Sequence, residues 1–141
     1  MEEPVNGGPG SGTPPVILVV EDEVLIRLDN AEGLRAAGYR VIEAADALEA
    51  LGFISASAPL NLLITDINMP GEIDGIGLAE MTRALRPGLP VVIASAQSAP
   101  AIDGLADRII RKPYFASELV SIAQELIEAS WQTGNDNQQA C

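Results

Sequence analysis

The hydrophobic positions of this chain follow two spacings, one typical of strands and one typical of helices. Short, continuous runs rich in β-branched residues have the pattern of strands that are buried on both faces of a parallel sheet. Such runs predict five strands, at 16–20, 39–43, 61–66, 90–95 and 107–111. Other segments carry apolar residues at helical spacing or are bounded by helix caps and stops, and they predict helices at 23–37, 46–57, 75–85 and 115–131.

Turn and capping residues mark the ends of these elements. Asp22 is suited to cap the first helix, and Gly38 can adopt the left-handed conformation that often ends one. Pro59 stops the second helix, and Pro87 begins the stop of the third. The alternation predicts an α/β, doubly wound (βα)5 sheet that is flavodoxin-like, with strand order 2-1-3-4-5 and helices on both faces.

The segment between the last two strands breaks this alternation. Only sixteen residues separate Ser95 from Lys112, and they include Pro100 and Gly104 with little helical pattern. We therefore predict that the fourth helix of the alternation is shortened or absent.

The chain is predicted to hold one domain between two unstructured ends. Residues 1–15 are rich in glycine and proline and predict a disordered leader, because they cannot bury enough apolar surface to offset the entropy of ordering. Residues 16–131 form the domain, and the polar residues 132–141 are expected to be a flexible tail.

Composition narrows the function classes. The 141 residues include 20 acids, 8 bases and no histidine, for a net charge of −12. This charge argues against a partner that is a nucleic acid or an anionic membrane surface. No apolar stretch approaches the ~20 residues that span a bilayer, and we expect no export signal. The single cysteine, Cys141, fits a reducing compartment, so we predict a cytoplasmic location.

Charged residues follow three of the predicted strands. Glu21 and Asp22 end the first, Asp66 ends the third, and Lys112, the only lysine of the chain, follows the fifth. Because ligands of such sheets bind outside the carboxyl ends of the strands, we expect these side chains to share one pocket.

A cation would relieve the repulsion among these acids. Carboxylates within a few ångströms raise one another's pKa, and Mg²⁺ prefers oxygen ligands of this kind. In the alternative, Glu21 and Asp22 merely cap the following helix, which stabilises it by about 0.3 to 1 kcal/mol. The charged ends of two other strands, at Asp66 and Lys112, favour the ion.

Five short motifs in order carry a family resemblance over about residues 16–130. The chain resembles the receiver domain of two-component response regulators, of the single-domain type known from chemotaxis regulators. The motifs are Glu21-Asp22, Asp66 with Asn68-Met69-Pro70, Asp74-Gly75, Ser95-Ala96 and Lys112-Pro113.

The resemblance implies a phosphorylation chemistry. Asp66 is expected to accept a phosphoryl group from a phosphohistidine on a sensor histidine kinase or a histidine phosphotransfer protein. Lys112 and Ser95 are expected to bind phosphoryl oxygens, because such transfer depends mainly on positioning and on neutralising charge.

The resemblance also implies a set of metal ligands. Mg²⁺ is expected to bind Asp22 and Asp66 directly, Glu21 through water, and the backbone carbonyl of Asn68. The family commonly has a cis peptide bond before the proline at position 113. In the alternative, Pro113 is simply the first residue of the last helix.

The expected function is that of a stand-alone receiver, phosphorylated with Mg²⁺, that signals by contact with an unknown downstream protein. Phosphorylation and slow dephosphorylation would be self-catalysed, so we do not expect a conventional enzyme. A homodimer is left open. An aspartate-nucleophile phosphatase would need a second aspartate two residues after the nucleophile, and that position is Asn68.

The alternative is a receiver-like binding module that works without phosphorylation. It is motivated by Ile109, which stands where the family usually carries the aromatic residue that couples to the hydroxyl at position 95. The short segment before Lys112 also favours it, since the family often uses its fourth helix and fifth strand as the output surface.

Overall fold

A parallel sheet of five strands lies at the centre of the computed structural model, which describes residues 13–96 and 104–140, with side chains as far as Trp131. The strands pair in the order β2-β1-β3-β4-β5, which confirms the predicted order. Each begins and ends within one residue of its predicted bounds: β1 Val16–Val20, β2 Arg40–Ala44, β3 Leu62–Asp66, β4 Val91–Ser95 and β5 Arg108–Arg111.

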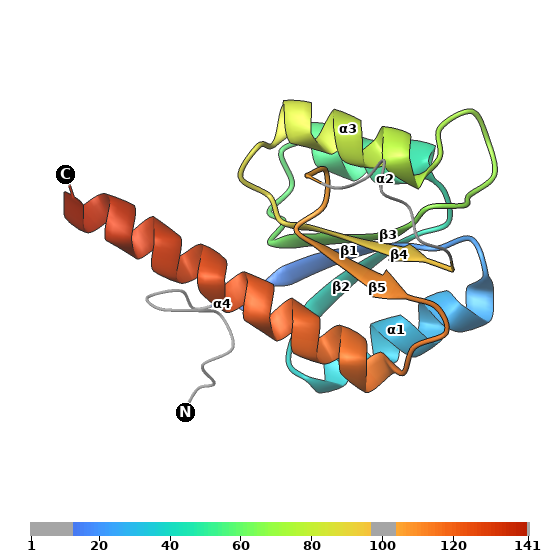
Figure 1. Cartoon of the computed structure of the whole chain (residues 1–141), viewed down its shortest axis with the longest axis horizontal. Coiled ribbons are helices and arrows are strands. Elements are labelled where there is room, and N and C mark those ends of the chain that lie inside the picture. The colour runs from blue at the N-terminus through green and yellow to red at the C-terminus, as the bar shows by residue number, and fades with distance from the viewer. Residues whose placement is uncertain (1–12, 97–103, 141) are drawn as a thin grey trace.

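Helices cover both faces of the sheet (Figure 1). On one face lie α1 (Val24–Ala36) and α4 (Ala116–Ala140). On the other lie α2 (Ala47–Ser55) and α3 (Gly75–Leu85). The doubly wound architecture is therefore confirmed.

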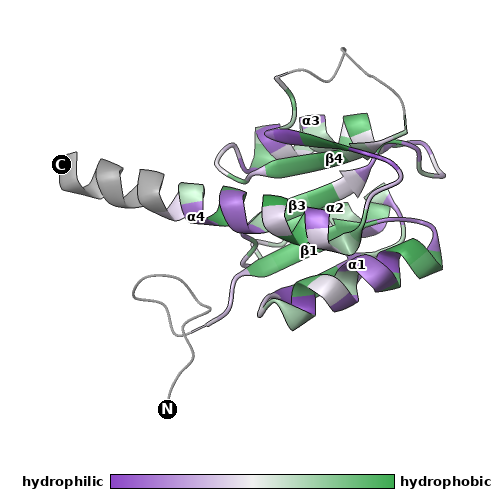
Figure 2. Ribbon diagram, turned by 60° about the horizontal axis from the view of Figure 1, so that its bottom comes forward, coloured by the Kyte–Doolittle hydropathy of each residue, from purple (hydrophilic) through white to green (hydrophobic). Residues whose placement is uncertain are grey.

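The sheet divides the core into two apolar clusters. Every residue of β1, β3 and β4 is buried, and these strands are the hydrophobic centre of the ribbon in Figure 2. Successive side chains of a strand point to opposite faces, so Leu18 joins the cluster under α2 and α3 whereas Ile17 joins the cluster under α1 and α4. Burial on both faces explains why the predicted strands are continuous apolar runs.

The helix ends follow the predicted chemistry with one correction. Asp46 and Asp74 cap α2 and α3, each accepting a hydrogen bond from a backbone N–H three residues on, and Gly38 has a φ of 104° after α1. The prediction that Asp22 caps α1 was wrong, because the helix begins one residue later. Its N-cap is Glu23, which makes no side-chain cap hydrogen bond.

The last helix is longer than predicted. The sequence suggested an end near Trp131, whereas α4 continues to Ala140. Adding residues to a helix that has already formed costs little compared with starting one, so α4 can extend past its last apolar residue. The expected flexibility of residues 132–141 stays a prediction.

The connection between β4 and β5 holds no helix in residues 96 and 104–107, which fits the predicted loss or shortening of one. The other residues of this connection, 97–103, lie outside the described part, as do residues 1–12 of the predicted leader. No helix of the described residues has the length and apolar character that crossing a membrane requires.

Candidate functional site

Three strands deliver charged side chains to one rim of the sheet. In the register of the sheet, Val20 pairs with Thr65, Asp66 with Ala94, and Ser95 with Arg111. Glu21 and Lys112 each come directly after a paired strand end, and Asp66 is the last residue of β3. The topology therefore brings together residues that are as much as 91 positions apart.

The acids of this rim form a tight cluster. Glu21, Asp22 and Asp66 each offer a carboxylate oxygen, and the three oxygens all lie within 4.8 Å of one another. Glu21 and Asp66 are buried, at 2% and 6% exposure, whereas Asp22 is exposed. The cluster is thus closed on the protein side and open to solvent at Asp22.

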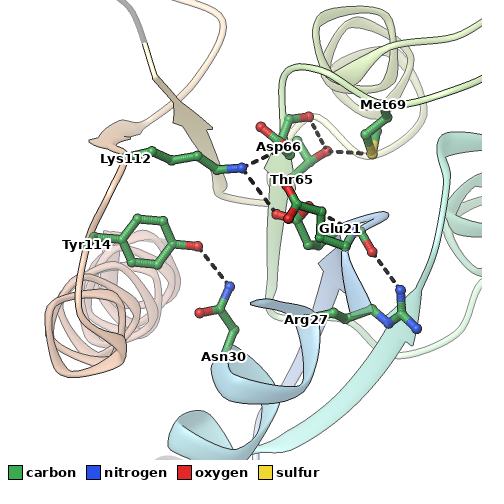
Figure 3. Close-up of polar contacts among 9 residues, drawn as sticks. Glu21, Arg27, Asn30, Thr65, Asp66, Met69, Lys112 and Tyr114 are labelled. Atoms are coloured by element: carbon green, nitrogen blue, oxygen red, sulfur yellow. Dashed lines mark hydrogen bonds and ion pairs between the residues drawn. The ribbon is translucent and has the colours of Figure 1, made fainter. Parts of the chain in front are cut away.

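Lys112 reaches into this cluster from the end of β5 (Figure 3). Its Nζ lies 2.9 Å from Oδ2 of Asp66 and 3.4 Å from Oε1 of Glu21. The expected convergence of the acids and the single lysine is observed.

Burial and the crowding of carboxylates at the rim shift the pKa values of Glu21 and Lys112. Burial and the charge of Asp66 raise the pKa of Glu21, against opposing effects of the Glu23 backbone N–H and Lys112. Burial acts to lower the pKa of Lys112, but its hydrogen bond to Asp66 and the charges of Glu21 and Asp66 outweigh burial and raise it. Lys112 therefore carries its charge, and Glu21 is ionised less readily than an ordinary glutamate.

The donor set fits a hard divalent cation. Three ionised carboxylates and the one ammonium that contacts them, among the described residues, would leave two negative charges uncompensated. Oxygen ligands, partial exposure and this charge match Mg²⁺, which keeps several waters and takes one or two carboxylates directly. Neither Glu21 nor Asp22 is the N-cap of α1, which is Glu23, although the Glu21 carboxylate accepts a 3.2 Å hydrogen bond from the Glu23 backbone N–H.

Two other predicted site residues lie on the same rim. Ser95 ends β4 with 4% exposure, and its carbonyl accepts a 2.9 Å hydrogen bond from the backbone N–H of Lys112. Asn68 is exposed in the loop after β3. The expected contacts of the Ser95 hydroxyl with phosphate and of the Asn68 carbonyl with metal stay predictions.

Gly75 brings α3 against the acceptor strand. Its N–H donates to the carbonyl of Ile67 at 2.8 Å, and a Cβ at this position would overlap the backbone carbonyl oxygen of Asp66. Only glycine permits this approach, which places the start of α3 directly beside Asp66.

The structure decides between the two predictions for Pro113, a cis peptide bond before it or a role as the first residue of the last helix. The Lys112–Pro113 peptide bond is cis, and α4 starts at Ala116. Pro113 therefore does not start the last helix.

Arg27 is a site residue that the sequence analysis missed. Its Nη1 donates to the backbone carbonyl of Glu21 at 2.7 Å (Figure 3), and its Nε lies 3.3 Å from Oε1 of Glu43. A salt bridge of 3.2 Å joins the same glutamate to Arg35. A basic residue at an inward position of α1, one turn before buried Asn30 and Ala31, was the available signal.

Comparison with known proteins decides the family. A family model for the response regulator receiver domain matches residues 17–124. The chain belongs to this family.

Curated relatives of this receiver are regulators of greater length. The transcriptional regulatory protein PrrA of Mycobacterium tuberculosis is 31% identical over 130 residues, a match that covers 89% of this chain and 55% of PrrA. The transcriptional regulatory protein PdtaR of Mycobacterium tuberculosis is 36% identical over 116 residues, covering 78% of this chain and 55% of PdtaR. The receiver thus spans about half the length of the curated relatives that it matches.

Solved structures share the architecture. A CheY-like receiver domain protein from Methanospirillum hungatei superposes with a TM-score of 0.78 at 27% identity, covering 84% of this chain and 98% of the other. NtrX from Brucella abortus superposes with a TM-score of 0.80 at 34% identity, covering 88% of this chain and 29% of NtrX.

Membership of the family sets the general chemistry. Receiver domains are signalling modules of two-component systems, generally without enzyme activity of their own, that interact with histidine kinases or phosphotransfer proteins. Phosphorylation on an aspartate and binding of Mg²⁺ at an acidic pocket are typical of the family. The acidic cluster of this chain fits that pocket in donor type and in position.

Proposed function

We propose that this receiver accepts a phosphoryl group on Asp66, with Mg²⁺, and passes the signal on by protein contact. The observation that carries the proposal is the 2.9 Å contact of Lys112 with Asp66 beside two further carboxylates. The phosphodonor is the phosphohistidine of a sensor histidine kinase or a histidine phosphotransfer protein. A carboxylate oxygen of Asp66 forms the new O–P bond as the P–N bond to the imidazole breaks.

The other residues of the rim hold charge and geometry in this proposal. Asp22, Asp66 and the Asn68 carbonyl would hold Mg²⁺ directly, and Glu21 would do so through water. When bound, the ion neutralises oxygens of the transferring group. Lys112 and the hydroxyl of Ser95 bind phosphoryl oxygens, and the buried position of Asp66 strengthens each of these interactions.

Self-catalysed phosphorylation and slow self-catalysed hydrolysis belong to the same proposal. Three further predictions belong to this proposal. The receiver is located in the cytoplasm, it contacts a downstream protein, and it can form a homodimer. Whether the receiver acts alone is a further prediction, because the curated relatives continue beyond the matched region.

A phosphorylation assay tests the proposal. A small-molecule phosphodonor such as acetyl phosphate, with Mg²⁺, should label the wild type at a site that is stable to denaturation and labile to base. The variant Asp66→Asn should not be labelled, and removal of Mg²⁺ with EDTA should also abolish labelling. The matched control is Asp29→Asn, which changes an exposed carboxylate of α1 near the same rim and should leave labelling intact. Persistent labelling of Asp66→Asn contradicts the assignment.

One observation favours a second candidate, a binding module that does not use phosphorylation. Ile109 replaces the aromatic residue usual in the family and carries no ring, so it cannot couple to position 95 as an aromatic side chain would; it is 36% exposed. An NMR titration with Mg²⁺ and beryllofluoride separates the two candidates. A response centred on Asp66 supports phosphorylation, and an unchanged spectrum supports the alternative.

A further inference from the structure

We propose that a hydrogen bond between Asn30 and Tyr114 positions the segment that carries Lys112, and so sets the reach of its ammonium to Asp66. The two residues are positioning residues, because neither contacts the carboxylates among the interactions of the described residues. The inference rests on the proposed function, since it concerns the rate at which Asp66 is phosphorylated.

The segment in question is short and anchored at both ends. Residues 112–115 connect β5 to α4. At the entrance, the backbone N–H of Lys112 donates to the carbonyl of Ser95 at 2.9 Å and continues the sheet. At the exit, the N–H of Phe115 donates to the Glu118 carboxylate at 2.8 Å and fixes the start of α4. Hydrogen bonds therefore fix the positions of both ends of the segment.

Between these anchors, Tyr114 reaches across to α1. Nδ2 of Asn30 donates a 2.8 Å hydrogen bond to the Tyr114 hydroxyl, which joins residues 84 positions apart (Figure 3). Asn30 is 3% exposed. A buried amide needs a partner, and the Tyr114 hydroxyl is one. The bond is therefore a fixed link between α1 and the residue two places after Lys112.

Side-chain packing is incomplete beside the segment, although Tyr114 packs against the apolar cluster under α1 and α4. A cavity of about 530 Å³ lies between the first half of α1 and the segment. It is lined by Leu25, Ile26, Asp29, Asn30, Ala96, Lys112, Pro113 and Tyr114. Where side chains do not fill the space between two elements, dispersion contacts are lost and a directed hydrogen bond does more to set their separation.

One turn further along α1 the contact becomes close. A Cβ added at Gly33 would lie 3.1 Å from Cβ of Ala116, so the backbone of α1 runs directly against the start of α4. Residues three apart on a helix share a face, so Gly33 and Asn30 form one seam. The helices are held by contact at Gly33 and by the hydrogen bond at the end nearer Lys112.

Loss of the bond should therefore loosen the part of the segment between its two anchors, directly after Lys112. Small displacements of a charged group reduce phosphotransfer, because positioning and charge neutralisation supply most of the catalysis. A displacement of Lys112 would lengthen its contacts of 2.9 Å with Asp66 and 3.4 Å with Glu21.

The chain offers a matched pair of variants. It contains two tyrosines, Tyr39 and Tyr114, and both are partly buried against the same apolar cluster. Tyr114→Phe and Tyr39→Phe each remove one hydroxyl. We expect Tyr114→Phe to slow phosphorylation by acetyl phosphate about fivefold, equivalent to ~1 kcal/mol, and Tyr39→Phe to leave the rate unchanged. Equal rates for wild type and Tyr114→Phe overturn the inference.

The single lysine permits a readout that does not depend on phosphorylation. Protein labelled with ¹³C and ¹⁵N only in lysine gives one set of ε-methylene signals, which belongs to Lys112. These signals should move toward the positions of a free lysine in Tyr114→Phe and stay in place in Tyr39→Phe. If the wild type is not phosphorylated, the proposed function fails while this measurement still tests the link.

A double-mutant cycle separates positioning from a general loss of structure. In a Lys112→Met background, Tyr114→Phe should not slow the remaining phosphorylation further, because its effect passes through the ammonium. A further fivefold loss in that background overturns the inference. Urea unfolding of both tyrosine variants checks that the fold is retained.

Discussion

The two faces of β5 are covered very differently. Ile110 points to the face of α1 and α4 and is 6% exposed, whereas its neighbour Ile109 points to the other face and is 36% exposed. On the first face the long helix α4 passes over the sheet (Figure 1). On the second face no helix precedes β5 in residues 96 and 104–107.

This difference separates the chemistry of the receiver from its signalling surface. The charged rim depends on the segment that leads into α4 and on strand ends, where Glu21, Asp66 and Ser95 are buried. The face of β5 that bears Ile109 is not needed to hold the carboxylates or Lys112. A receiver can therefore keep its phosphorylation geometry while the surface expected to report phosphorylation changes.

The largest expected effect comes from truncating the two neighbouring isoleucines. Ile110→Ala should lower the free energy of unfolding by about 3 kcal/mol, because it opens a cavity in the core. Ile109→Ala should lower it by less than ~1 kcal/mol, since much of that side chain is already hydrated. Urea unfolding measures both. Similar losses would show that the second face is as tightly covered as the first.

Gly75 provides a second test, because here the face of α2 and α3 comes close to the site. Gly75→Ala should destabilise the fold by about 2 kcal/mol and slow phosphorylation, since the new Cβ would overlap the backbone of Asp66. The control is Gly52→Ala in α2, where a Cβ meets nothing within 4 Å. That variant should gain roughly 0.5–1 kcal/mol from the higher helix propensity of alanine. Normal phosphorylation of Gly75→Ala would contradict the proposed contact.

The smallest effect is a change in pH dependence. The pKa of Glu21 is raised in the folded protein above its ordinary 4.5, so the folded state keeps a proton that the unfolded chain has lost. Without metal, this group therefore contributes a loss of stability as pH rises from about 4.5 through the raised pKa. Glu21→Gln should remove that loss and be more stabilising at neutral pH than at pH 4.5.

Urea unfolding across this pH range, with and without Mg²⁺, measures the difference. Saturating Mg²⁺ should remove or reverse the advantage of Glu21→Gln, because the ion favours the ionised carboxylate. If the free energy of unfolding of wild type and of Glu21→Gln changed in parallel with pH in the absence of metal, the raised pKa of Glu21 would be contradicted.

Much of the fold was predictable because its local signals agree. The run Val16–Val20 is apolar throughout since both of its faces are buried, and Asp74 precedes a helix that starts where predicted. The charged rim was predictable for a topological reason. Once the strand order is known, residues at strand ends such as Asp66 and Lys112 must share one edge.

The remaining features depend on partners that a local pattern does not contain. Asn30 stands at an inward position of α1, which signals a buried amide in need of a partner, but nothing near it in sequence indicates Tyr114. Arg27 likewise contacts a main-chain oxygen that carries no sequence signature. The end of α4 was misjudged, because polar residues extend a formed helix without an apolar stripe.

The two cations near the acids do different work. Arg27 binds the main-chain oxygen of Glu21 and pairs with the carboxylate of Glu43, so it takes up none of the side-chain oxygens of Glu21, Asp22 or Asp66. Lys112 instead contacts side-chain oxygens of Glu21 and Asp66. These contacts must change when a metal ion or a phosphoryl group binds the same oxygens. The guanidinium thus fixes the backbone of the rim, whereas the ammonium is a counter-charge that can be exchanged.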